Sequence, residues 1–248
     1  MFRSRIRYST TAVLGCFLAL AAAAAGALAG PLYRGEILPL GDAFNLLRWA
    51  AYGGVVAAVV SLIGLIRSRP GVRRRGFVYA LIGLCAGVAV FWLPYSQQQA
   101  AKRVPAIHDI TTDTENPPEF LALPALRPKD ANSLEYGGPD LARRQKQAYP
   151  DIQPARFDAA PDRVFDEAVS TAREMGWDIV EHDAAQGRIE AVATTFWFGF
   201  KDDVVIRIDG TPQGTRVDMR SVSRVGVSDA GKNAARIRAY IEALRERL

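Results

Sequence analysis

Residues 49–93 read WAAYGGVVAAVVSLIGLIRSRPGVRRRGFVYALIGLCAGVAVFWL, which is two apolar runs separated by a short arginine-rich segment. The runs, about residues 49–66 and 77–93, each have roughly the 17–20 residues that a helix needs to cross a hydrocarbon core. A third run at about residues 12–30 precedes them and consists almost entirely of Ala, Leu, Val and Gly. The sequence therefore predicts a membrane segment at residues 1–95 with two or three transmembrane helices.

The arginines of this segment are distributed unequally around the runs. Three of them lie within residues 1–7 and five within residues 67–75, whereas residues 31–48 carry no net charge. Because positively charged loops remain in the cytoplasm, the N-terminus is expected inside and the chain after Tyr95 outside. In a bacterium, this predicts an inner (plasma) membrane protein with a periplasmic, or extracytoplasmic, C-terminal domain.

The first apolar run has two interpretations. Ala27, Leu28 and Ala29 form a pattern typical of a signal-peptidase site, so this run is either a retained span or a cleaved signal peptide. The predicted topology after this run is the same in both cases.

The charge balance separates the membrane segment from the rest of the chain. The net charge of the 248 residues is +5, but residues 1–95 contribute +8 and residues 96–248 contribute −3. A mildly acidic domain argues against nucleic acid as a partner. The expected partners are the lipid bilayer itself and either an anionic lipid or another protein of the cell envelope.

The region after the membrane segment divides into an irregular and a regular part. Residues 96–148 form a proline-rich arm, because closely spaced prolines exclude long helices and central strands, and its apolar residues predict that it packs on the domain. Residues 149–248 predict a two-layer α+β domain, with an antiparallel sheet covered by helices on one face. The expected helices are residues 161–175 and 231–247, in each of which the apolar residues recur at the spacing of one buried face. The expected strands are residues 177–181, 188–195, 203–208 and 215–225.

Three stretches carry a family resemblance. They are HDITTDTENPPEF at residues 108–120, AYPDI at residues 148–152, and DMRSVSRVGVSDAGKNAARI at residues 218–237. Together they resemble the DUF1499 family over about residues 105–245, and members of this family carry the domain alone or behind membrane spans. The resemblance implies no activity, because none is assigned to the family.

Arginines on the last two strands are candidate ligand-binding residues. Arg216, Arg220 and Arg224 share one face of a strand, and Arg207 on the preceding strand can join them. Guanidinium groups suit carboxylate or phosphate, so this row predicts an anionic ligand such as a lipid headgroup. The alternative is a solvated face with cross-strand ion pairs to Asp218, Glu190 or Asp203.

The stretch FWFGF at residues 196–200 is the second candidate binding feature. Its aromatic side chains must point to both faces of a strand, so Trp197 is a candidate contact to a membrane, ligand or partner. The alternative is an aromatic core with a glycine bulge.

Enzymatic signatures are weak. Asp109, Asp113 and Glu115 could hold a hard cation, but capping of turns is the favoured explanation for these residues. Ser221 lacks the strand–turn–helix context of a nucleophile, and no phosphate-binding or dinucleotide-binding loop is present. The sequence thus favours a membrane protein whose domain binds an anionic or lipidic ligand or an envelope partner, with no cofactor. The alternatives are a metal-assisted hydrolase using the acidic residues and a structural subunit of a membrane assembly.

Overall fold

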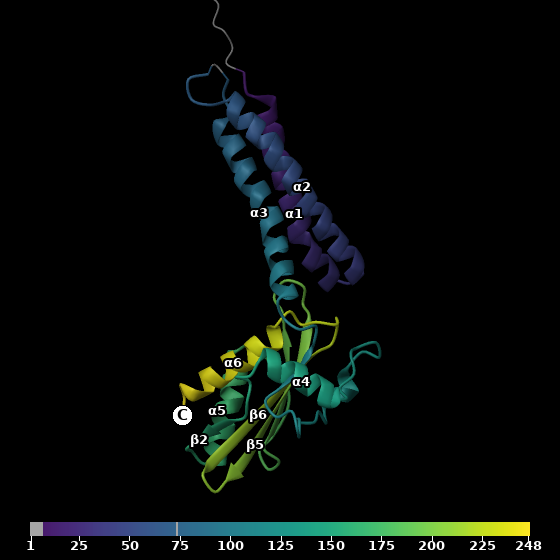
Figure 1. Cartoon of the computed structure of the whole chain (residues 1–248), viewed down its shortest axis with the longest axis vertical. Coiled ribbons are helices and arrows are strands. Elements are labelled where there is room, and N and C mark those ends of the chain that lie inside the picture. The colour runs from purple at the N-terminus through teal and green to yellow at the C-terminus, as the bar shows by residue number, and fades with distance from the viewer. Residues whose placement is uncertain (1–6, 73) are drawn as a thin grey trace, which may run out of the picture. The chain divides into compact units, whose positions relative to one another are not determined.

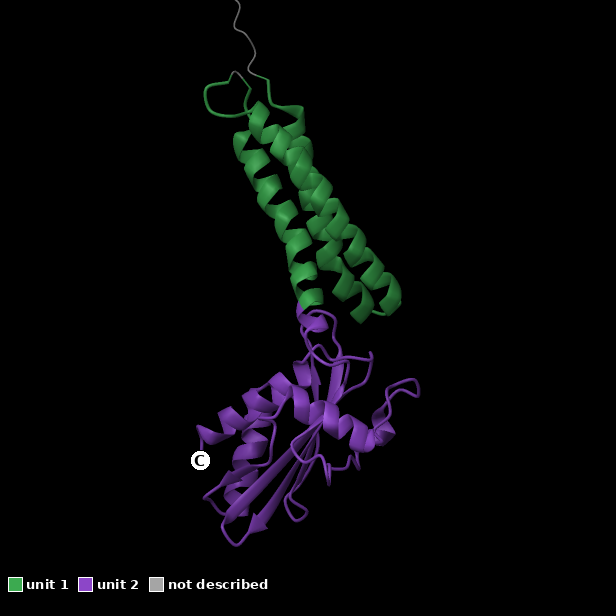
Figure 2. Ribbon diagram, viewed as in Figure 1, with its two compact units in different colours: residues 1–99 green, residues 100–248 purple. Residues whose placement is uncertain are grey.

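The computed structural model describes residues 7–72 and 74–248. The chain forms two compact units, residues 1–99 and 100–248 (Figure 2). Arg3, Arg5 and Arg73, which contribute to the predicted topology, lie outside the described residues.

The first unit consists of three long helices, α1 (Thr10–Arg34), α2 (Leu40–Arg67) and α3 (Phe77–Lys102) (Figure 1). Each is long and apolar enough to cross a membrane, as the hydropathy of the sequence predicted. The helices extend beyond the apolar runs, because the flanking residues are mostly compatible with helix. The polar end of α3, residues 96–102, is SQQQAAK, in which Gln, Ala and Lys are good helix formers.

Small residues bring these helices close together. A Cβ atom added at Gly83 of α3 would lie 2.8 Å from the Cα of Cys16 in α1, and closer still to the hydroxyl of Ser61 in α2. The backbones therefore approach more closely than larger side chains would allow, as is common between helices in lipid.

The second unit is built on one antiparallel sheet. Its strands are β1 (Asp109–Thr111), β2 (Ala155–Phe157), β3 (Asp178–Asp183), β4 (Arg188–Thr194), β5 (Lys201–Thr211) and β6 (Gly214–Ser223). The order is β1-β6-β5-β4-β3, and β2 also pairs with β6, so β1 and β2 share the outer edge of that strand. The remaining elements are the 3-10 helix η1 (Leu123–Leu126) and the helices α4 (Gly138–Ala148), α5 (Pro161–Glu174) and α6 (Lys232–Arg245).

Helices α5 and α6 cover one face of the sheet, which confirms the predicted α+β architecture (Figure 1). The alternating residues Val204, Ile206 and Ile208 of β5 join the main core on this face. Trp177 and Tyr240 stack there with ring centroids 5.1 Å apart, and the Tyr240 hydroxyl donates to the carbonyl of Ala168 at 2.9 Å. The helical periodicity of α5 and α6 therefore identified the right faces.

The opposite face of the sheet is covered as well. A second, smaller core forms between the sheet and residues 120–134 of the arm, and consists of Phe120, Leu123, Val192, Val205 and Val222. The arm also contributes β1, which the sequence analysis did not anticipate because three residues are too few to show alternation. The sheet thus lies between a helical layer and an irregular layer.

Candidate functional site

Two of the four predicted ligand-binding arginines hold the arm on the sheet. The guanidinium of Arg220 donates to both carboxylate oxygens of Asp109, at 3.0 and 2.8 Å, and to the carbonyl of Leu134 at 2.8 Å. It lies between the rings of Phe120 and Tyr136, each 5.4 Å away. Arg220 is only 3% exposed, so it is not displayed to solvent, in contrast to the expectation for an open arginine row.

Arg224 is in a similar position further along β6. Its guanidinium donates to Asp203 at 2.9 and 2.7 Å, and Asp203 also pairs with Arg127 of the arm at 2.9 Å. All three side chains are at least nine-tenths buried. The cross-strand pairing considered for the sequence therefore exists, but within a covered layer rather than on a solvated face.

Arg207 and Arg216 form a compact cluster with two aspartates. Both arginines donate to Asp113 Oδ2, at 3.1 and 2.7 Å, and both donate to Asp218 Oδ2 at 2.8 Å. Burial alone would raise the pKa of Asp113, but backbone N–H groups of Asn116 and Glu115 and the two guanidinium groups outweigh it, so the pKa is lowered. Asp113 therefore remains ionised and joins β5, β6 and the arm.

The three carboxylates of the predicted metal site point to different partners. Asp109 pairs with Arg220, Asp113 with Arg207 and Arg216, and Glu115 with Lys146 at 3.4 Å. Within residues 7–72 and 74–248, no group of three or more His, Cys, Asp or Glu side chains is placed to hold a metal ion. The structure therefore does not bring these three residues together as a set of ligands.

Ser221, the serine considered as a nucleophile, forms hydrogen bonds that connect elements of the fold. Ser221 Oγ lies 2.8 Å from Asn233 Oδ1 and accepts a hydrogen bond from Arg236 at 3.0 Å. These contacts connect β6 to the first turn of α6. Neither partner is a general base of the kind that activates a serine hydroxyl.

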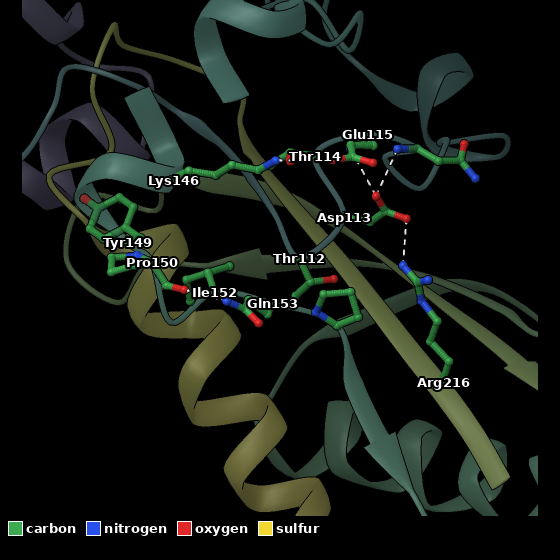
Figure 3. Close-up of a pocket in the computed structure, with 12 residues that line it drawn as sticks. Thr112, Asp113, Thr114, Glu115, Lys146, Tyr149, Pro150, Ile152, Gln153 and Arg216 are labelled. Carbon is green, nitrogen blue, oxygen red and sulfur yellow. Dashed lines mark hydrogen bonds and ion pairs between the residues drawn. The ribbon is translucent and has the colours of Figure 1, made fainter. Parts of the chain in front are cut away.

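A groove of about 740 Å³ opens beside the outer edge of β6, between β1 and β2 (Figure 3). The segment that connects β1 to β2 leaves the sheet here and returns to it after α4. Both ends of this connecting segment line the groove. Lys146 at the end of α4 extends toward Glu115, and Asp113 lies between Glu115 and Arg216 (Figure 3). The lining residues are Thr112, Asp113, Thr114, Glu115, Asn116, Lys146, Tyr149, Pro150, Ile152, Gln153, Pro154 and Arg216.

The groove combines an apolar wall with polar groups of both charges. Tyr149, Ile152 and two prolines supply the apolar part. The Tyr149 hydroxyl is buried and forms no hydrogen bond with any residue that the structure describes, and burial raises its pKa. This mixture suits a ligand with one charged group and an apolar body.

Lys146 is the most available cation of this groove. Its ammonium pairs with Glu115, and the two side chains are 59% and 87% exposed. Such an exposed pair contributes only about 0–1 kcal/mol, so a ligand anion can replace Glu115 at little energetic expense. The guanidinium of Arg216, by contrast, is already engaged by Asp113 and Asp218.

The predicted candidates that do not lie beneath the arm divide between three places. Arg216, Asp113 and Glu115 line the groove, whereas Arg207 lines a smaller cavity of about 250 Å³ together with Arg188. Trp197 lies in the β4–β5 loop and lines neither cavity.

Lys146 was missed by the sequence analysis, because nothing distinguishes it from the other basic residues of α4. Thr112 and Tyr149 could have been found from the family resemblance, because they belong to two of its three stretches. Residues of both stretches line this groove.

Comparison with known proteins identifies one family. Residues 109–244, more than half of the chain, match the model of the family described as protein of unknown function, DUF1499. Comparison with curated proteins gives no match. The chain therefore belongs to the DUF1499 family.

Proposed function

We propose that this chain is a membrane-anchored binding protein, whose domain receives an anionic group of its ligand in the groove between α4 and β6. The observation that carries the proposal is the pairing of Lys146 with a highly exposed carboxylate at the rim of a 740 Å³ groove. An anion at this position replaces a weak ion pair by a stronger, partly desolvated one.

The other arginines have supporting roles in this proposal. Arg216 lines the groove, and both Arg216 and Arg207 position Asp113. Asp113 in turn orders residues 113–116 by accepting hydrogen bonds from two backbone N–H groups. Arg220 and Arg224 are positioning residues that hold the arm on the sheet.

We place the domain outside the cytoplasm of a bacterial inner membrane. The support is the arginine asymmetry of the membrane segment, in which the cluster at residues 67–75 favours the cytoplasm and the chain crosses once more after it. The available ligands are then anionic lipids and anionic components of the envelope.

Native mass spectrometry of the full chain, released gently from membranes, tests the proposal. An anionic molecule is expected to remain bound to the wild type and to be lost from Lys146→Gln. The matched control is Arg143→Gln, which removes an exposed cation of the same helix whose side chain is 73% exposed and pairs with Asp140. Retention of the molecule by Lys146→Gln, absence of any bound molecule, or a bound divalent metal in its place would each contradict the proposal.

A further inference from the structure

Three segments that are distant in the sequence meet at one end of the sheet. In this antiparallel sheet, β1 begins where β6 ends, and β4 ends where β5 begins, all at the same end. The preceding and connecting segments, residues 103–108, 195–200 and 224–231, are therefore neighbours, and the backbone N–H of Asp229 donates to the carbonyl of Ile107 at 3.1 Å. We call these three segments the tip of the domain.

The β4–β5 loop of the tip has a defined shape. Phe198 is buried and stacks on Phe200 with ring centroids 5.1 Å apart. The loop is closed by Thr195, whose hydroxyl accepts a hydrogen bond from the Phe200 N–H at 2.8 Å, and Gly199 adopts a positive φ of 69°. Because Phe198 anchors the loop inward, the two preceding aromatic residues are displayed at the surface.

The tip combines exposed apolar and basic side chains. Phe196 is 94% exposed, Trp197 41% and Val227 76%, whereas the acidic residue of the tip, Asp229, is only 9% exposed and caps α6. Exposed basic residues lie within the tip or next to it, namely Lys102, Arg103, Lys201 and Lys232. Aromatic rings with surrounding lysine and arginine are the combination that anionic membrane interfaces bind.

The connectivity of the chain favours a bilayer over a soluble partner. Helix α3, which is long and apolar enough to span a membrane, ends at Lys102, and β1 begins at Asp109. The connection enters the domain at the tip and can extend at most about 25 Å. The tip is thus the end of the domain at which the chain arrives from the last of these helices.

We propose that the tip inserts Phe196, Trp197 and Val227 into the headgroup layer of an anionic bilayer. Such insertion adds a second attachment to the membrane helices and restricts the orientation of the domain above the bilayer. It does not depend on the ligand groove, so each proposal can fail without the other.

A fluorescent label attached to cysteine tests this proposal in the full chain. With Cys16→Ala and Cys85→Ala as background, Val227→Cys receives the probe NBD, and the protein is reconstituted in vesicles of phosphatidylethanolamine and phosphatidylglycerol. Lipid-borne spin labels are expected to quench this probe several-fold more strongly than a probe at Gln213→Cys, in the β5–β6 turn at the opposite end of the sheet. Equal quenching at the two positions would overturn the proposal.

The contribution of the aromatic side chains is tested by a double substitution. Phe196→Ser with Trp197→Ser, in the Val227→Cys background, is expected to abolish the excess quenching, and vesicles of phosphatidylcholine alone are expected to weaken it. Phe196 is 94% exposed, whereas the ring of Trp197 also contacts Phe198 with centroids 5.0 Å apart, so the unfolding midpoint of the variant is measured alongside and should stay well above the assay temperature. Quenching that persists after the double substitution, or that is equally strong in neutral vesicles, would contradict insertion driven by aromatic and basic side chains.

Discussion

Arg220→Met is expected to release the arm from the sheet. The arginine makes two hydrogen bonds to Asp109 and further bonds to the carbonyls of Leu134 and Pro118, and it fills the space between two aromatic rings. Methionine fills a similar space without creating a large cavity, so the substitution isolates the loss of the charge and its hydrogen bonds.

The expected loss follows from burial. Asp109 is 4% exposed and would remain as a buried carboxylate without its cation. Removing one partner of a buried ion pair destabilises by about 3–5 kcal/mol, and the two carbonyl oxygens lose a donor in addition. Since about 1.4 kcal/mol is a factor of ten, the open state of the arm should become about a hundred to several thousand times more populated.

Hydrogen exchange of the full chain in detergent measures this directly. Amides of residues 117–136 should exchange faster by that factor in Arg220→Met, whereas amides of α6 should change less if the arm opens locally. Asp109→Asn combined with Arg220→Met should recover part of the loss, because the buried charge is then removed. The control Arg143→Met removes an exposed ion pair and should change exchange little. Acceleration of the arm amides by less than tenfold would refute the role of this ion pair.

Three further predictions concern buried or tightly packed positions. Glu190 is fully buried and accepts hydrogen bonds from the backbone N–H groups of residues 121–123. Glu190→Gln should therefore lower the free energy of unfolding by about 2–3 kcal/mol in a urea titration. A change within about 0.5 kcal/mol would contradict this. The pKa of Asp113 is lowered from its ordinary value of 3.8, so its contribution to the free energy of unfolding is complete above that value and is lost as the pH falls through the folded-state pKa. Asp113→Asn should therefore flatten the decline of the unfolding midpoint below about pH 4. In the first unit, Gly83→Ala should destabilise the helices by about 1–3 kcal/mol in thermal unfolding. Gly41→Ala, where an added Cβ meets nothing within 4 Å, should be neutral, and equal effects would exclude close packing as the cause.

Much of the fold follows from patterns that are local in the sequence. Apolar length predicted the three long helices of the first unit, and the spacing of apolar residues in α5 and α6 predicted which sides they bury. Alternation along β5 and β6 identified which residues share a face of the sheet. These features depend on contacts between close neighbours or on the bilayer, so the sequence contains them directly.

The covering of the second face could not be predicted in the same way. Alternation shows that Arg220 and Arg224 share a face, but it does not show what lies on that face. Their partners come from elsewhere, since Asp109 is 111 positions away from Arg220 and Asp203 is 21 positions away from Arg224. The groove has the same origin, because Lys146 and Arg216 line the same cavity only after the chain has left the edge of β6 and returned to it.

The arm and the groove depend on one another through Asp113. This residue orders the start of the segment that connects β1 to β2 and lines the groove, and the same carboxylate fixes Arg207 and Arg216 on the sheet. The rest of the arm is held by the pairing of β1 with β6, by apolar contacts on both faces of the sheet and by ion pairs. Long connections without regular structure are commonly functional when a rigid scaffold orders them. In the proposed binding mode, the ligand anion on Lys146 replaces Glu115, which lies only two residues from Asp113. We therefore expect binding in the groove to act on the segment that fastens the arm.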